Sequence, residues 1–173
     1  MKTLVISHYT VRDVNAKPWE ETWENLVQFA EKMTPRFTSL DIKLKLRKVI
    51  LDDVTQDTLM SGNLVTFSCD DLDLAETPIE VLLMMTSDFS PCDSCVTPDG
   101  VGFACRVLKD FEGNEVFALT EGLFLEASLR VAFKSQESGC DGMSCSSCAS
   151  GCGDEEIGKS CGGGCSCSCG HKD

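Results

Sequence analysis

Hydrophobic and polar positions over residues 1–134 repeat with two different periods, which predicts a mixture of strands and helices. Residues 2–7 form a short apolar run typical of a strand. Residues 42–47 alternate between apolar and basic side chains, the two-residue period of a half-buried strand. Between them an apolar stripe at helical spacing follows Pro18, which suits the first turn of a helix, and Pro35 is expected to end that helix. The stripe consists of Trp19, Trp23, Leu26, Val27, Ala30 and Met33.

The rest of this region continues the alternation of strands and helices. We expect a short helix at 53–60 that ends before Gly62, a strand at 64–68, and a strand or buried helix at 79–85. After these we expect a hairpin of strands 103–109 and 116–119 around the turn Glu112-Gly113-Asn114. A last helix is expected from the capping residue Thr120 to Ala132. Strands that alternate with helices predict an α/β fold with a mixed sheet covered by helices. A thioredoxin-like arrangement fits this order of elements and this size.

Residues 135–173 have a different composition. This stretch of 39 residues holds nine glycines, nine serines and eight cysteines, and its other apolar residues are Met143, Ala149 and Ile157. So few apolar side chains do not offset chain ordering, which costs about 1–2 kcal/mol per residue. The sequence therefore predicts a folded domain over 1–134 and a disordered, cysteine-rich tail over 135–173, which ions bound to its sulfurs would order.

The charge of the chain excludes several classes of partner. The net charge of -13 and the pI near 4.5 argue against nucleic acid and against anionic membrane surfaces. No apolar run reaches the length of about 18 residues that a membrane-spanning helix needs. The opening residues, MKTLVISHYT, have too short an apolar stretch for a signal peptide, so a cytoplasmic protein is expected.

Twelve cysteines in 173 residues are the main chemical signal. In a cytoplasmic chain this density favours metal ligation or redox chemistry over structural disulfides. Cys92 and Cys95 have the spacing that binds one tetrahedral ion in a tight turn or forms a reversible disulfide. Cys105 is a candidate third ligand or resolving thiol. Cys69 is expected to be a small buried hydrophobe, but it or a tail cysteine is also a candidate fourth ligand.

The tail adds a second group of candidate ligands. They are Cys140, Cys145, Cys148, Cys152, Cys161, Cys165, Cys167 and Cys169, together with His171. Soft thiolates select zinc, Cu(I) or another thiophilic ion, and the imidazole of His171 suits zinc unless it is simply a solvated terminal residue. An iron–sulfur cluster is disfavoured because the spacings match neither common ferredoxin pattern.

Several stretches carry a family resemblance over about residues 1–133. They are MKTLVI, SGNLVTFSC followed by TPIEVLL, Cys92-Asp93-Ser94-Cys95, Cys105-Arg106 and FEGNEVFALTEGLFLEASL. These stretches resemble a little-characterised prokaryotic family with a thioredoxin-like fold, which implies that fold and a set of thiols. Such proteins usually carry Cys-x-x-Cys between the first strand and the first helix, whereas that loop here, HYTVRDVNAKPW, has no cysteine. Pro78 matches the position of their cis-proline, with its isomer left open by the sequence, and the tail resembles metallothionein segments in composition.

These observations favour binding of soft metal or metalloid ions through thiolates, with the tail capturing ions and handing them to a metal-transfer partner. One alternative is a thiol–disulfide oxidoreductase that uses Cys92 and Cys95 as its catalytic pair and acts on a redox partner. Another is a structural zinc site in an interaction module. The sequence has no phosphate-binding glycine loop, Ser/His/Asp set or HExxH motif, and His8 is expected to be structural.

Overall fold

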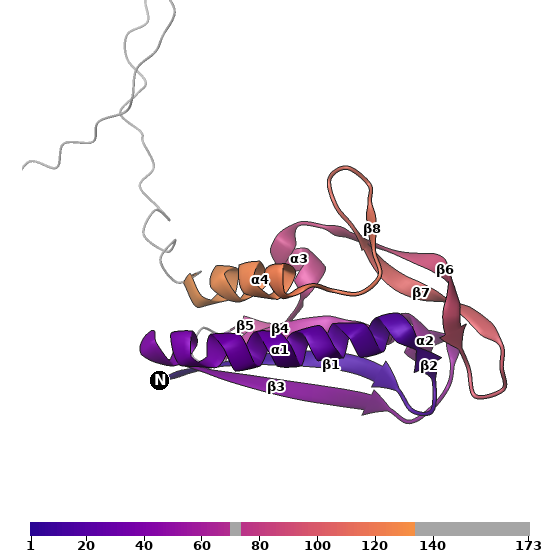
Figure 1. The fold of residues 1–173 in the computed structure, drawn as a ribbon, viewed down its shortest axis with the longest axis horizontal. Coiled ribbons are helices and arrows are strands. Elements are labelled where there is room, and N and C mark those ends of the chain that lie inside the picture. The colour runs from indigo at the N-terminus through magenta and orange to yellow at the C-terminus, as the bar shows by residue number, and fades with distance from the viewer. Residues whose placement is uncertain (70–73, 134–173) are drawn as a thin grey trace, which may run out of the picture. The chain divides into compact units, whose positions relative to one another are not determined.

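The computed structural model describes residues 1–69 and 74–133, which form two four-stranded sheets and four helices (Figure 1). The predicted disorder of the tail lies outside the described residues. The same is true of the eight tail cysteines and of His171. The fold and the site are therefore built from residues of the region predicted to be the folded domain.

The first sheet is mixed and has the strand order β3-β1-β4-β5. Its strands are β1 (Lys2–Val11), β3 (Ile42–Leu51), β4 (Val65–Cys69) and β5 (Leu74–Pro78). β1 and β3 run parallel along their whole length, β4 is antiparallel to β1, and β5 is antiparallel to β4. The prediction of an α/β fold with a mixed sheet is confirmed, and β3 contains the segment of alternating apolar and basic residues.

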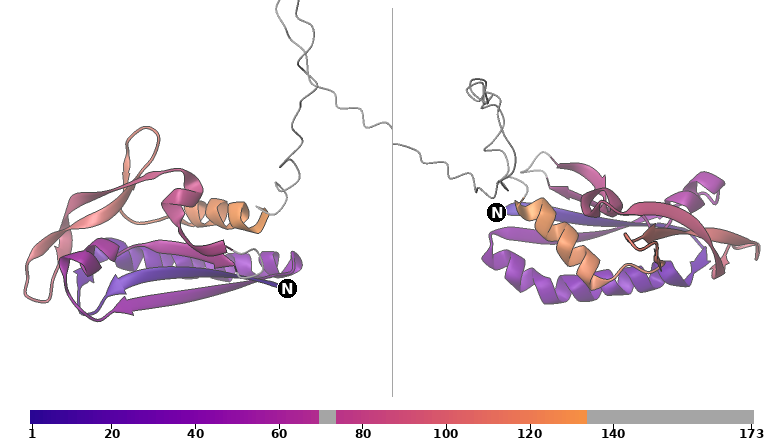
Figure 2. Two further views of the ribbon diagram at one scale, coloured as in Figure 1. Left: turned by 180° about the vertical axis from the view of Figure 1, so that it is seen from behind. Right: turned by 90° about the horizontal axis from the view of Figure 1, so that it is seen from above.

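The helices are α1 (Lys17–Ser39), α2 (Gln56–Ser61), α3 (Ile79–Leu83) and α4 (Glu121–Phe133). α1, α3 and α4 supply side chains to the main core on this sheet, whereas α2 packs into a smaller second core through Leu59. The long helices α1 and α4 lie side by side (Figures 1 and 2), and the rings of Phe29 and Phe124 join them at 5.9 Å. Leu4 of β1 and Phe67 of β4 complete this core from the sheet. None of the helices in the described ranges is long and apolar enough to cross a membrane.

The second sheet is antiparallel and was only partly predicted. It has the order β2-β6-β7-β8, with β2 at Asn15–Ala16, β6 at Thr86–Val96, β7 at Gly102–Lys109 and β8 at Glu115–Val116. The predicted turn between β7 and β8 is confirmed: Gly113 has a φ of 83°, and the Asp110 carboxylate accepts bonds from the backbone N–H groups of Glu112 and Asn114. The strands β2, β5 and β6 were not foreseen.

Pro35 does not end α1, so that prediction is wrong. The helix continues past Pro35 to Ser39. It does so because the Phe37 side chain is buried and packs against Phe29, with 6.5 Å between the ring centroids. Burial of a phenylalanine side chain contributes about 1.5–3 kcal/mol, which offsets most of the cost of the backbone bond that proline removes.

The segment after Pro78 is the helix α3, which decides between the two structures expected for residues 79–85. Pro78 is the N-cap residue of α3 and the register partner of Thr66 in β4. The peptide bonds of the described residues contain no cis bond, so Pro78 follows a trans bond. This decides the isomer of Pro78, which the sequence left open.

Trp19 joins α1 to the second sheet. Its side chain is buried in a small second core and lies 5.6 Å from Phe103 of β7. Gly62, directly after α2, lies against the Trp19 indole so closely that a Cβ atom there would overlap the ring. The backbone of Gly62 has an ordinary negative φ, so the need for glycine comes from packing.

The substitution Gly62→Ala is expected to lower the free energy of unfolding by about 1–3 kcal/mol, because the indole must move within a filled core. Gly102→Ala in β7 is the matched control, since a Cβ there meets only the Cys95 carbonyl oxygen at 3.9 Å. Urea denaturation of both variants measures the difference. Equal losses in the two variants would show that the indole adapts without cost.

Candidate three-cysteine site

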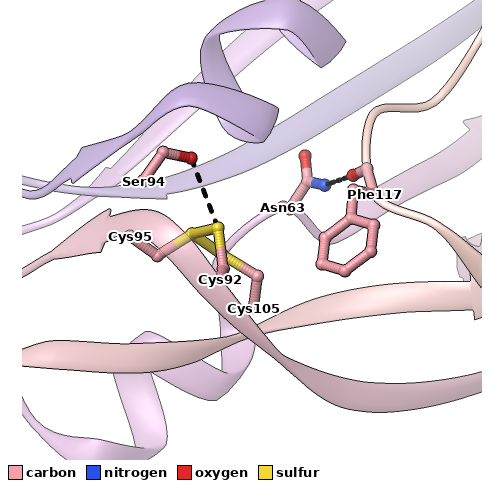
Figure 3. The surroundings of a disulfide bond; sticks show 6 residues. All are labelled: Asn63, Cys92, Ser94, Cys95, Cys105 and Phe117. Carbon is pink, nitrogen blue, oxygen red and sulfur yellow. Dashed lines mark hydrogen bonds between the residues drawn. A yellow bond between two sulfur atoms is a disulfide. The ribbon is translucent and has the colours of Figure 1, made fainter.

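Two strands of the second sheet bring three cysteines together. Cys92 and Cys95 lie in β6 and Cys105 lies in β7 (Figure 3). Their sulfur atoms all lie within 4.8 Å of one another. The sequence grouped these residues as candidate ligands, and the structure confirms that they converge.

An irregularity in strand pairing makes this convergence feasible. β6 advances from Pro91 to Val96 while its partner β7 advances only from Ala104 to Gly102. In a regular strand, residues three apart point to opposite faces of the sheet. The extra length of β6 forms a bulge that turns both cysteine side chains toward Cys105. The expected tight turn is thus replaced by an irregular strand.

The sulfurs lie in an apolar environment. Cys95 and Cys105 have no exposed surface, and Cys92 is partly exposed. The surrounding buried side chains are Val11, Ala16 and Trp19, with Val14, Leu51, Leu59, Phe103 and Phe117 packed against them. The Ser94 hydroxyl lies 3.4 Å from the Cys92 sulfur (Figure 3). Cys92 is therefore the sulfur of the three that solvent reaches.

The site lies beside the start of α1. Ala16 is the N-cap residue of this helix and the register partner of Cys95. The sequence placed no thiol near this helix end, because the preceding loop has no cysteine. The short strand β2 brings a cysteine of β6 there instead, a pairing between residues 79 positions apart that no local pattern signals.

The arrangement has two chemical outcomes. The sulfur of Cys95 is at bonding distance from both Cys92 and Cys105, and the Cα separations are 5.3 and 6.7 Å. Both separations suit a disulfide, but one sulfur forms a single disulfide at a time. The oxidised cluster thus has two alternative bonds that share Cys95, and the reduced cluster offers three thiolates to a metal ion. The cluster can bind a metal or form disulfides.

Comparison with known proteins places the chain in a family. The model of a family described as Domain of unknown function (DUF2703) matches residues 3–128. The chain belongs to this DUF2703 family. The match spans both sheets and all three clustered cysteines, and the family description names no activity. No curated protein and no solved structure matches the chain.

Arg106 fixes the strand of the DUF2703 domain that carries Cys105. Its guanidinium forms an ion pair with Glu80 of α3, and both side chains are largely buried. Breaking a buried ion pair on one side is costly, because the remaining charge loses its partner. The pair therefore holds β7 against α3 next to the cluster.

Cys69 is a small buried hydrophobic residue, as predicted. It is 2% exposed, lies in the main core and is the register partner of Leu4. It is not among the clustered sulfurs, so its alternative role as a fourth ligand there is wrong. The tail cysteines remain predicted ligands.

His8 is a structural residue, as predicted. It is fully buried, its Nε2–H donates to the Asn63 side-chain oxygen at 3.1 Å, and its ring stacks 6.0 Å from that of Trp23. Its Nδ1 atom has no hydrogen-bond partner among the described residues. Burial has the largest effect and lowers the pKa of His8 to about 4; the hydrogen bond to the Asn63 side-chain oxygen opposes this shift, and the nearby positive charge of Lys48 adds to it.

Asn63 is a residue that the sequence did not single out. Its backbone has a φ of 61°, a conformation that asparagine adopts more readily than most residues. Its side-chain nitrogen donates to the Phe117 carbonyl oxygen at 2.8 Å (Figure 3). Since its oxygen binds His8, Asn63 connects β1 to the segment that packs against the cysteines.

The burial of His8 predicts a loss of stability in acid. Because the pKa of His8 in the folded state lies below the value of 6.5 for a free histidine, the stabilisation is complete above pH 6.5 and is lost as the pH falls toward 4. Between pH 7 and pH 5, the free energy of unfolding should fall by about 2 kcal/mol more than in His8→Gln. Urea denaturation at both pH values tests this. Identical pH dependence in the two proteins would rule out His8 as the titrating group.

Proposed function

We propose that this DUF2703 protein binds soft metal or metalloid ions through thiolates, with Cys92, Cys95 and Cys105 as its central site. One observation carries the proposal: three sulfurs from two strands meet in the interior of the molecule. A buried thiol that only fills space in a core needs no other sulfurs near it, whereas a bound thiophilic ion needs several sulfur ligands. Zinc, Cu(I) and other thiophilic ions are the candidate classes.

The tail has a second role in this proposal. Residues 1–134 act as the folded domain, and residues 135–173 capture further ions and hand them to a metal-transfer protein. The tail donors are the eight cysteines and His171 named above. Because thiolate ligands are replaced one at a time, the tail passes an ion to its partner protein without releasing it.

We also propose that the domain is thioredoxin-like and works in the cytoplasm. A parallel β1-α1-β3 unit followed by the antiparallel strands β4 and β5 supports the first assignment. The position of Cys95 beside the start of α1 supports it too, because this is where thioredoxin-like proteins hold their reactive thiols. The assignment to the cytoplasm is supported by the need for free thiolates, because a reducing compartment keeps the cluster in its thiol form.

Thiol–disulfide exchange is the second candidate function. The observation that favours it is the position of the Cys95 sulfur between two bonding partners. In such a reaction the Cys92 thiolate attacks a disulfide substrate, releases one substrate thiol and forms a mixed disulfide. A second cluster thiol then attacks the Cys92 sulfur of this mixed disulfide, which releases the other substrate thiol and leaves one disulfide in the cluster. Exchange needs two thiols at a time, while the third sulfur is better explained by ligation.

Metal analysis after anaerobic purification tests the proposed function. A full-length variant with the eight tail cysteines replaced by serine is expected to retain about one soft ion per chain. The triple variant Cys92→Ser, Cys95→Ser and Cys105→Ser is expected to lose this ion and keep only ions bound by the tail. Elemental analysis together with a thiol count gives both results.

Cys69→Ala is the matched control, because Cys69 is buried but lies outside the cluster. It should leave the metal content unchanged. A different result would favour the redox function over the binding function. In that case the variant without tail cysteines would carry no metal and would reduce a model disulfide faster than free thiol does, and the added substitution Cys92→Ser would abolish this turnover.

A further inference from the structure

We propose that the three-cysteine site is matched to a trivalent, three-coordinate metalloid of the arsenic(III) and antimony(III) type. This inference rests on the proposed function, since it specifies the ion for the same site. It follows from the number of donors, from the charge of the filled site and from the exposure of its sulfurs.

The number of donors distinguishes between ions. Zinc in structural sites takes four protein ligands in a tetrahedron. The ligand atoms that gather here, among the residues the structure describes, are the three sulfurs of Cys92, Cys95 and Cys105. Asp93, between two of them in the chain, is exposed and is not part of the group. A trivalent metalloid completes its shell with three sulfurs and a lone pair, so it needs no fourth ligand.

The charge of the filled site gives the stronger argument. Three thiolates carry three negative charges, so a monovalent or divalent ion leaves a net negative complex, and a trivalent one gives a neutral complex. The side chains packed around the sulfurs include Val11, Trp19 and Phe103, and two of the three cysteines, Cys95 and Cys105, have no exposed surface. A net charge in such a place is poorly solvated, which is unfavourable.

The helix dipole does not change this conclusion. The start of α1 beside Cys95 favours negative charge, but its effect is that of a partial charge. Proline at the first turn also removes one of the backbone N–H groups that would face an anion. This end of the helix therefore compensates only part of the charge that a divalent complex would leave.

The exposure of the sulfurs suits stepwise capture. Cys92 is partly exposed, whereas Cys95 and Cys105 are fully buried. With arsenite, each thiol replaces one hydroxyl group on arsenic and releases one water molecule. Three As–S bonds form, three As–O bonds break and the oxidation state of arsenic does not change. The reaction starts at Cys92 and ends with the ion among apolar side chains.

The experiment uses the reduced full-length variant with its eight tail cysteines replaced by serine, and sodium arsenite and zinc chloride as probes. Native mass spectrometry is expected to show one arsenic atom bound with the loss of three protons from the protein, one from each cluster thiol. Arsenite is expected to displace bound zinc into a colorimetric chelator, and equimolar zinc is expected not to displace arsenic. Cys69→Ala should give the same adduct.

Other outcomes overturn the inference in distinguishable ways. Zinc that binds through the three cysteines and resists arsenite would refute the metalloid assignment and leave the proposed function intact. An arsenic adduct with only two protons lost would also refute it, because one sulfur would then take no part. Failure of arsenite to bind the reduced protein would refute the metalloid assignment, and failure of arsenite, zinc and Cu(I) alike would refute both proposals. These readouts use the intact cluster, so they do not depend on the folding of variants that lack Cys92, Cys95 or Cys105.

Discussion

The packing of the Trp19 indole is the contact on which the arrangement of the site depends. Trp19 lies in the first turn of α1, contacts Phe103 of β7 and lies against the backbone of Gly62 after α2. It therefore fixes the second sheet relative to the helix that covers the first. Without a large apolar side chain at this position, the small core that holds Cys95 and Cys105 would lose its central member.

Two sets of polar contacts support this second core from outside. Asn63 connects His8 to the segment before α4, and the ion pair of Arg106 with Glu80 connects β7 to α3. Both involve side chains that are largely or fully buried, where a hydrogen bond or an ion pair is costly to leave unmade. The cysteine-bearing strands are thus held from both sides, which keeps three sulfurs close together at a strand irregularity.

The geometry explains how a chain without cysteines in its first loop still has thiols at the start of α1. The strand β2 is only two residues long, but its pairing with β6 places Cys95 opposite the N-cap residue of the helix. The bulge in β6 then turns Cys92 toward the same point. The thiols beside the helix are supplied from a distant part of the chain.

The local pattern of residues predicted the mixed sheet and the two long helices, because the periodicity of apolar side chains is a property of neighbouring residues. Residue type and position in the chain predicted the buried role of Cys69 and the structural role of His8. The three clustered cysteines were recognised by type and spacing. Only the tertiary structure decided that Cys92 and Cys95 lie in a strand, that Pro35 is tolerated inside α1 because Phe37 is buried, and that the sulfurs meet beside α1. These features depend on pairings between residues far apart in the chain and on the free energy of burial that the pairings provide. Neither can be read from the residues next to each position.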